Sequence, residues 1–326
     1  MKRKNIIGTV VFFLIVFVTL ILLSNVCNRI YLKSNNVMTG RFQNIAGIQS
    51  QRNDTVDVLV LGDSESYTSV SPSYLWQTDG ISAYAIGESG QTVIEAYYAM
   101  KTALETQKPK VVFIETNMLY RGAPKLNTKG AAFSEFYQSK FSIFRYHNMW
   151  KNYFTSKHVK HLQFFNGFSI RSTVTPYTQG PYMNKTEFSK PIPDDVKKYF
   201  NNIISLCKKK DVQVVLYSAP SPKNYNYEKH NAISEYAVEL GVPYLDLNLT
   251  GPELQINWNT ETLDQGDHLN VAGAQKTSEY IRSYLKTNYV LQDHRSDVRY
   301  NAWAKRAAEF QKQCDAHTKK IEDGGT

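Results

Sequence analysis

The stretch Val56-Asp57-Val58-Leu59-Val60-Leu61-Gly62-Asp63-Ser64-Glu65-Ser66 decides the fold. It opens with a short apolar run, which is typical of a strand buried on both faces of a parallel sheet. The glycine that follows allows the chain to turn sharply where the strand ends. A serine directly after this turn would lie at the carboxyl edge of the sheet. Turns of this composition are common without any catalytic role, so the rest of the chain must decide what this one does.

Strands and helices alternate along the chain as far as about residue 290. Further short apolar runs predict strands over residues 82–86, 111–114, 212–217 and 242–246. Apolar residues at helical spacing predict helices over residues 92–105, 194–210, 227–240 and 271–289. This alternation predicts an α/β fold of three layers, in which helices cover both faces of a parallel central sheet. Ligands of such folds bind outside the carboxyl ends of the strands.

The N-terminus differs from the rest of the chain, because no charged residue occurs between Lys4 and Arg29. This apolar window is long enough for the roughly 20 residues that cross a bilayer core. We therefore expect residues 1–28 to form a cytoplasmic flank and a single transmembrane anchor, with residues 6–26 in the membrane. The cations of Met1-Lys2-Arg3-Lys4 favour an N-terminus inside a bacterial cell and an extracytoplasmic location for the rest of the chain.

Three other interpretations of the window are less favoured. A cleaved signal peptide usually has a shorter apolar region and a small-x-small cleavage site, and Leu23-Ser24-Asn25-Val26-Cys27 offers no good one. Lipid attachment at Cys27 would require a smaller residue than Val26 before it. A core helix of a soluble protein rarely lacks a polar face.

Composition excludes several classes of protein. The 326 residues are 42% apolar and 21% charged, which excludes collagen, coiled coils and wholesale disorder. The net charge of +9 raises the question of nucleic-acid binding. No nucleic-acid motif is present, and without the flanking Lys2, Arg3 and Lys4 the remaining charge is +6. Three cysteines without CxxC spacing predict neither a disulfide framework nor a zinc site, and Cys207 is expected in the core.

Two further segments fall outside the βα pattern of residues 55–290. Residues 29–54 are polar and predict a stalk. Residues 120–190 form an insertion whose aromatic side chains either pack it onto the sheet, which we favour for most of them, or stack on sugar rings. These residues are Tyr120, Phe133, Phe136, Tyr137, Phe141, Phe144, Tyr146, Trp150, Tyr153 and Phe154. Four basic residues or histidines of the insertion fit either an anionic polymer or a solvated face, namely Lys157, His158, Lys160 and His161.

The charged C-terminal segment, residues 291–326, contains an amphipathic helical pattern. Its apolar face gathers Trp303, Ala307, Phe310 and Cys314. The segment can dock on the domain, lie on a membrane surface or form a frayed tail, and we favour docking.

Chemically useful residues follow the predicted strands. A serine, a glycine before a helix, an asparagine and a histidine with nearby carboxylates occur at successive strand ends. In chain order these are Ser64, Gly87 or Gly90, Asn117, and then Asp264, Asp267 and His268. A free helix N-terminus and an asparagine amide can hold an oxyanion, and a histidine with a carboxylate can activate a serine.

This ordered set resembles the SGNH (GDSL-type) hydrolase superfamily, whose four blocks carry Ser, Gly, Asn and His. The resemblance covers about residues 55–290 and implies a flavodoxin-like arrangement of the three layers. It implies that Ser64 is the nucleophile and His268 the general base. It also implies an oxyanion hole made of the Ser64 N–H, the Gly90 N–H and the Asn117 side chain. Gly90 fits the glycine block better than Gly87.

One position departs from the family pattern. The family usually has an aspartate three residues before the histidine, where this chain has Gln265. Asp264 lies four residues before His268, and Asp267 lies directly before it. We favour Asp264 with an adjusted turn as the histidine's partner, with Asp267 as the alternative. A Ser–His dyad without an aspartate is also possible.

An N-terminal span followed by such a domain resembles the membrane-anchored SGNH proteins of bacterial envelope acylation, including the teichoic acid D-alanylation D protein and the partners of alginate and peptidoglycan O-acetylation. This resemblance implies transfer of an acetyl group, or less readily D-alanyl, to an envelope polysaccharide or teichoic acid. The implied partner is a membrane-bound O-acyltransferase, and acyl-serine chemistry needs no cofactor or metal. Carbohydrate deacetylation and a degenerate scaffold that only binds glycan remain alternatives. Trp258 and Tyr120 are the candidates for substrate contact.

Overall fold

The computed structural model describes residues 2–33, 42–121, 128–146 and 164–322. The chain forms two compact units. One comprises Met1–Phe42 and Asn127–His161, and the other comprises Gln43–Leu126 and Leu162–Thr326. The second unit contains all the residues that the sequence places at strand ends.

A five-stranded parallel sheet forms the centre of the second unit, in the order β2-β1-β3-β6-β7. The prediction of a parallel sheet in an α/β fold is therefore confirmed, and the order is the flavodoxin-like one. Every residue of β1 is buried, as its continuous apolar run requires. The strands are β1 (Val58–Leu61), β2 (Ala83–Ala85), β3 (Val111–Glu115), β6 (Gln213–Ser218) and β7 (Tyr244–Asp246). A small antiparallel pair, β4 (Phe164–Phe165) and β5 (Phe168–Ser169), lies outside this sheet.

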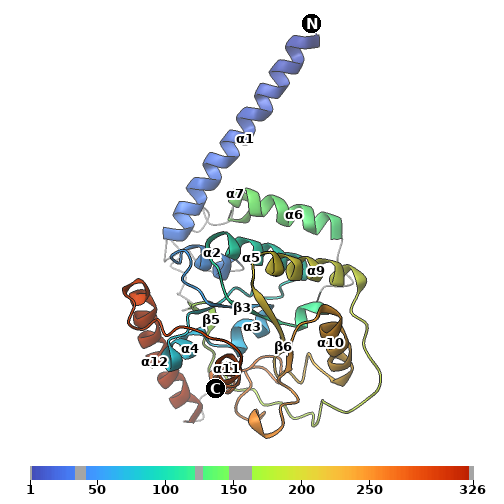
Figure 1. Ribbon diagram of the computed structural model, residues 1–326, viewed down its shortest axis with the longest axis vertical. Helices are drawn as coiled ribbons and strands as arrows, with labels where there is room; N and C mark the ends of the chain where they lie inside the picture. Colours follow the sequence, from blue (N-terminus) through green and yellow to red (C-terminus); the bar gives the residue numbers. More distant parts are fainter. Residues whose placement is uncertain (1, 34–41, 122–127, 147–163, 323–326) are drawn as a thin grey trace. The chain divides into compact units, whose positions relative to one another are not determined.

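Helices cover both faces of the central sheet (Figure 1). One face carries α5 (Val93–Thr106) and α9 (Asp194–Lys209), and α10 (Tyr227–Leu240) packs on α9 through the rings of Tyr236 and Phe200. The other face carries α3 (Ser64–Ser69), α4 (Pro72–Asp79) and α11 (Val271–Asn288). Leu75, Ile281 and Leu285 of these helices pack against Val58, Phe113 and Val215 of the sheet. The described residues of the unit also include the short 3-10 helices η1 (Asn117–Leu119), η3 (Gly251–Glu253) and η4 (Val298–Tyr300).

The C-terminal helix α12 (Asn301–Glu322) docks on this unit, as favoured from its pattern. Trp303, Ala307 and Phe310 are buried, whereas Cys314 is partly exposed. The Trp303 ring lies 5.6 Å from the ring of Trp76 in α4. Burial of an apolar stripe of this kind is what holds a surface helix in place.

The prediction that residues 29–54 form a polar stalk is wrong for residues 43–49. These residues form helix α2 (Gln43–Gln49), in which Ile45 and Ile48 are buried. Asn44 anchors the helix, because its Nδ2 donates to the carbonyl of Gly87 at 2.7 Å. Its N–H donates to Oε1 of Glu88 at 3.1 Å. The polar composition of residues 29–54 therefore did not predict this helix, because its stabilising partners are distant in sequence.

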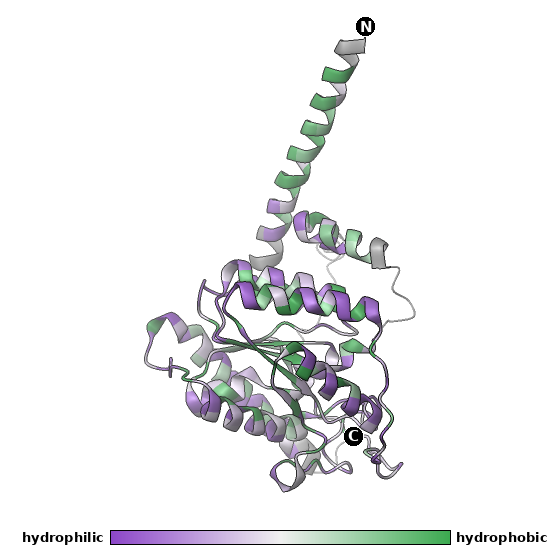
Figure 2. Ribbon diagram, turned by 45° about the vertical axis from the view of Figure 1, so that its right-hand side comes forward, coloured by the Kyte–Doolittle hydropathy of each residue, from purple (hydrophilic) through white to green (hydrophobic). Residues whose placement is uncertain are grey.

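The first unit contains α1 (Lys2–Lys33), α6 (Thr128–Lys140) and α7 (Ser142–Arg145). Within α1, Ile6–Asn28 is long and apolar enough to cross a membrane by length and composition, and Figure 2 shows this apolar stretch clearly. A leader sequence near an N-terminus would pass the same test.

The expectation that most aromatic residues of the insertion pack onto the sheet is wrong. Phe133, Phe136, Tyr137 and Phe144 are exposed and belong to the unit of α1, whereas Phe141 and Tyr146 are buried within it. Residues 162–190 of the predicted insertion belong to the unit of the sheet. The remaining aromatic, basic and histidine candidates, from Trp150 to His161, lie outside the described residues.

Candidate active site

The turn after β1 presents Ser64 at the carboxyl edge of the sheet. Gly62 is required there, because a Cβ atom at this position would lie 2.6 Å from the Cβ of Glu115 in β3. Asp63 caps the following helix, and its Oδ1 accepts a hydrogen bond from the Glu65 N–H at 3.0 Å. Ser64 is the first residue of α3, so its N–H has no acceptor within that helix.

The loop before α11 brings a histidine to the same edge. Gln265 and Gly266 adopt left-handed backbone conformations, with φ angles of 60° and 82°. The Gln265 N–H donates to the carbonyl of Thr175 at 2.8 Å, which holds this turn. The turn accommodates one more residue than the family spacing, so the Asp264 carboxylate folds back onto His268. Its Oδ1 accepts from the His268 N–H at 2.7 Å.

Three side chains form a continuous hydrogen-bonded chain. Nε2 of His268 lies 2.8 Å from Oγ of Ser64, and Nδ1 of the same ring lies 2.8 Å from Oδ2 of Asp264. A carboxylate can only accept, so Nδ1 carries the proton and Nε2 accepts from the serine hydroxyl. Asp267 is farther away, with its Oδ1 3.6 Å from Nδ1. The structure thus brings together the three residues of the favoured triad.

The surroundings shift the pKa of both members of the His–Asp pair. Burial acts to lower the pKa of His268, but the hydrogen bond and charge of Asp264 outweigh it, so the pKa is raised. For Asp264, burial acts to raise the pKa, and the hydrogen bonds and charge of His268 lower it overall. The carboxylate therefore stabilises the imidazolium that forms when His268 accepts a proton.

Asn117, the asparagine expected in the oxyanion hole, follows β3 and faces the same turn. Its Nδ2 donates to Oδ2 of Asp63 at 3.0 Å, and Oε1 of Glu65 lies 3.3 Å from it. The backbone N–H of Asn117 donates to the Glu115 carboxylate, at 2.9 Å to the nearer oxygen. The Asn117 amide thus faces the carboxylates of Asp63 and Glu65, the two residues that flank Ser64 in the chain.

The two candidate glycines have different surroundings. A Cβ atom at Gly87 would lie 1.9 Å from Oγ of Ser66, so this glycine permits close packing against the nucleophile turn. Gly90 has a left-handed φ of 59°, and nothing lies within 4 Å of the place where its Cβ would be. At Gly90 the left-handed φ, and not a lack of space, is therefore what favours glycine.

Sequence reasoning missed a group of polar residues around the triad. Glu65 is 3% exposed, and its Oε1 accepts from Nδ2 of Asn224 at 2.7 Å. The same amide donates to Oδ1 of Asp267 at 2.5 Å. It therefore joins α3, which begins with Ser64, to the loop that carries His268. Burial and the charges of neighbouring carboxylates raise the pKa values of Glu65 and Glu115. Arg121 forms an ion pair with Asp63.

Local sequence offered one weak indication of this group. Glu65 directly follows the serine, but an acidic residue in the first turn of a helix is ordinary because of the helix dipole. Asn224 lies 159 residues away from Glu65 and carries no motif. These contacts are products of the tertiary fold.

The two candidates for substrate contact have different surroundings, lysines for Tyr120 and aromatic rings for Trp258. Tyr120 is only partly buried, its hydroxyl donates to the Lys190 carbonyl at 3.0 Å, and the ammonium of Lys229 lies 4.9 Å from its ring centre. Trp258 packs edge-on against Tyr177 and Tyr182, with ring centres 6.2 and 5.9 Å away. Trp258 also lines an open depression of about 280 Å³, together with Tyr182, Met183 and Asn248.

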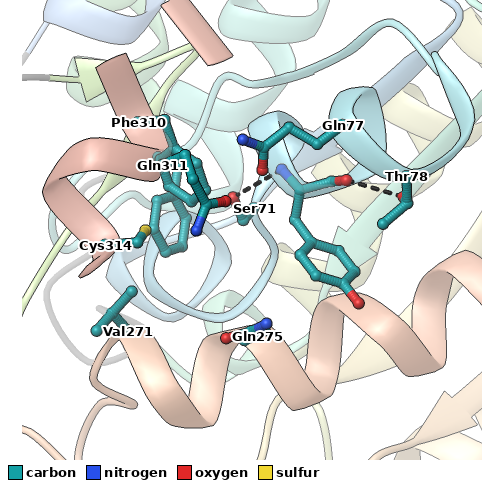
Figure 3. Close-up of a pocket in the computed structure, with 10 residues that line it drawn as sticks. Ser71, Gln77, Thr78, Val271, Gln275, Phe310, Gln311 and Cys314 are labelled. Atoms are coloured by element: carbon teal, nitrogen blue, oxygen red, sulfur yellow. Dashed lines mark hydrogen bonds between the residues drawn. The ribbon is translucent and has the colours of Figure 1, made fainter. Parts of the chain in front are cut away.

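A separate pocket of about 190 Å³ lies between α4, α11 and α12 (Figure 3). Gln77, Val271, Phe310 and Cys314 line it, and none of the triad residues does. Burial raises the pKa of the Cys314 thiol to about 12, so this cysteine is not a reactive thiolate.

Among the described residues, one set of side chains has metal-ligand types close together. Asp264, Asp267 and His268 place ligand atoms within 4.8 Å of one another. A cation there would compete for Nδ1 of His268, which already faces Asp264. Nδ1 of His268 and the Asp264 carboxylate can thus belong either to a metal site or to a triad. The hydrogen bond between Nε2 of His268 and Oγ of Ser64 favours the triad.

Known proteins offer only distant similarities to this chain. No protein-family model matches the chain, and no curated protein matches it. Among solved structures, a protein assigned to the G-D-S-L lipolytic family from Desulfitobacterium hafniense DCB-2 is similar, with 14% identity and a TM-score of 0.40 over 69% of this chain and 97% of that one. A GDSL-like lipase from Bacteroides thetaiotaomicron shares 14% identity at a TM-score of 0.37, over 71% and 87% of the two chains. These scores are low, so the function is inferred from this chain's own residues.

Proposed function

We propose that the protein is an SGNH-type serine enzyme that transfers an acyl group, most plausibly acetyl, to an extracytoplasmic polysaccharide. The observation that carries the proposal is the hydrogen-bonded chain from Ser64 Oγ through His268 to Asp264, with both links 2.8 Å long. A serine hydroxyl, a histidine and a carboxylate in this order are the working parts of nucleophilic acyl transfer.

The chemistry follows from the positions of these groups. Ser64 Oγ attacks the carbonyl carbon of an ester while its proton passes to Nε2 of His268. Asp264 stabilises the resulting imidazolium, and the Asn117 amide with the N–H groups of Ser64 and Gly90 receives the oxyanion. Collapse of the tetrahedral intermediate expels the donor alcohol, which takes the proton from His268. The acyl group then remains on Ser64 as an ester.

The second half of the reaction decides between transfer and hydrolysis. His268 deprotonates a hydroxyl that attacks the acyl-Ser64 carbonyl, and this hydroxyl belongs either to a sugar or to water. The aromatic depression at Trp258 and Tyr182 supports a sugar acceptor, because aromatic faces stack on sugar rings. A carbohydrate esterase of the same mechanism is the second candidate, since the triad itself serves both outcomes.

The location of the reaction is part of the proposal. The apolar segment Ile6–Asn28 supports a membrane anchor, and the preceding Lys2, Arg3 and Lys4 favour a cytoplasmic N-terminus. The acceptor is then an envelope polysaccharide or teichoic acid, and a membrane-bound O-acyltransferase would supply the acyl group.

The acyl-enzyme is the step to test first. Incubation with an aryl acetate followed by peptide mass spectrometry should find an acetyl group on Ser64. Ser64→Ala should abolish the adduct, whereas the exposed Ser283→Ala control should retain it. An acetylated peptide that persists in the Ser64→Ala protein would refute the nucleophile assignment.

Transfer and hydrolysis are separated by analysis of the envelope polysaccharide in cells that lack the protein. Loss of an acyl group supports transfer, and gain of one supports the esterase. An unchanged polysaccharide would refute both.

A further inference from the structure

Helices α6 and α7 of the first unit each bury a charged side chain and expose aromatic side chains. Glu135 and Arg145 are buried, and Oε2 of the first lies 3.4 Å from a guanidinium nitrogen of the second. The Arg145 guanidinium also lies over the ring of Phe42, 5.2 Å from its centre. One charged side chain of each helix, Glu135 and Arg145, therefore faces inward.

Aromatic side chains face outward on the same helices. Phe133 is 63% exposed, Phe136 is 42% exposed and Phe144 is 43% exposed. Tyr137 is also exposed, and its ring lies 4.4 Å from that of Phe133. Charged residues are rarely buried in water-soluble proteins, and contiguous exposed apolar patches mark interaction surfaces. An inverted arrangement of this kind suits surroundings that are themselves apolar.

Two contacts show where along α1 the helices α6 and α7 pack. The Phe141 ring, at the junction of α6 and α7, packs edge-on against Phe17 with ring centres 5.8 Å apart. Oγ of Ser142 donates to the carbonyl of Ser24 at 2.9 Å. Both Phe17 and Ser24 belong to Ile6–Asn28, the segment long enough to cross a membrane. The contacts thus fall between the middle of this segment and its C-terminal end.

The geometry points to the lipid bilayer as the occupant of this aromatic surface: we propose that α6 and α7 lie in the outer leaflet, with Phe133, Phe136, Tyr137 and Phe144 in contact with lipid. The helix pair packs on α1 through Phe141 and Phe17, and the exposed apolar side chains of α1 need the same surroundings. Lys140 is exposed beside them and can extend its ammonium to the headgroups. The proposal rests on the membrane location assumed for α1 in the proposed function.

Site-directed spin labelling of the full-length protein tests this placement. The protein is placed in vesicles of equal parts phosphatidylcholine and phosphatidylglycerol, after its three cysteines have been replaced. Nitroxides are attached through Phe136→Cys, Phe144→Cys or Phe133→Cys, one at a time. Collision with dissolved oxygen, which concentrates in lipid, is compared with collision with a water-soluble nickel chelate. Leu14→Cys in α1 serves as the lipid control and Val238→Cys, 83% exposed in α10, as the aqueous control.

The expected oxygen-to-nickel ratio at all three α6–α7 sites exceeds that at Val238 and approaches that at Leu14. A lipid-like ratio at Leu14 with aqueous ratios at the three sites would refute the proposal while leaving the anchor intact. An aqueous ratio at Leu14 would refute the anchor and the proposal together. Labels shielded from both reagents would show a protein contact in place of lipid, which also overturns the proposal.

Discussion

Two histidines of the second unit each meet an aspartate through Nδ1, yet their surroundings differ. His268 lies 2.8 Å from Asp264, and its other nitrogen lies 2.8 Å from Ser64. His230, in α10, lies 2.6 Å from Asp246 at the end of β7. Among the described residues, no serine is hydrogen-bonded to the His230 ring.

The two aspartates of these pairs, Asp246 and Asp264, also differ in their exposure and in their hydrogen-bond partners. Asp246 also accepts from the hydroxyl of Tyr225 at 3.1 Å and from the N–H of Asn248 at 2.9 Å, and its side chain is 6% exposed. Tyr225 continues to Tyr244, so this aspartate joins a buried polar network. Asp264 is 41% exposed and accepts from His268. The comparison teaches that the third group separates these two His–Asp pairs: of the two, His268 has a serine on its other nitrogen, and the proposed catalytic role depends on that serine.

Replacement of the two histidines is expected to give the largest difference in kcat. His268→Ala should lower kcat on an aryl acetate by at least about 1,000-fold, because a triad acts as a unit. His230→Ala should lower it by less than about tenfold, since it removes no reacting group. Equal losses in the two variants would show that the distinction between the pairs is wrong.

The two aspartates near His268 provide the next comparison. Asp264→Asn should lower kcat by about 1,000-fold or more, because the tautomer and charge that orient the imidazole are lost. Asp267→Asn should cost less than about tenfold, because its carboxylate lies 3.6 Å from Nδ1. Near-equal retention of kcat in both would indicate a Ser–His dyad.

The pH profile sharpens the same comparison. His268 acts as a base only when neutral, so kcat/KM of the wild-type protein should rise as pH rises through the raised pKa of His268. In Asp264→Asn the hydrogen bond and charge that raise this pKa are lost, so the ascending limb should move to lower pH. His230→Ala should leave the limb in place, and a shift there would mean that another group titrates.

Removal of the oxyanion donor should have a smaller effect. Asn117→Ala should lower kcat by about 100-fold, which corresponds to about 3 kcal/mol for one donor. KM for the ester should change little, because the contact is made to the transition state. Circular dichroism must show an intact fold, since Asn117 also donates to the buried Asp63. Unchanged kcat in a folded protein would exclude this amide from the site.

Replacement of His230, in the His230–Asp246 pair, is expected to have the smallest effect on activity and to change stability instead. His230→Ala removes one partner of a buried carboxylate, so the free energy of unfolding should fall by about 1–3 kcal/mol. Chemical denaturation measures this change, and Val238→Ala at an exposed position of the same helix provides the control. A stability equal to wild type would show that Asp246 is satisfied without His230.

Much of the fold could be predicted because its signals are local. Helix α10 has the predicted bounds, since the Asn226 side chain caps its start and Gly241, with a φ of 67°, ends it. Helix α2 was missed because its determinants are distant: Asn44 bonds to Gly87 and Glu88, 43 and 44 residues away. Glu65 and Asn224 were missed for the same reason.

The sequence by itself determined the alternation of strands and helices, the apolar N-terminal segment and the order of Ser64, Asn117 and His268, because short-range patterns of apolar and turn residues specify them. Only the tertiary structure decided which aspartate faces His268, since this depends on the left-handed turn at Gln265 and Gly266. It also decided that Glu135 and Arg145 face inward while Phe133 and Phe136 face outward. Burial is a property of the packed chain, and a residue's own neighbours in sequence do not determine it.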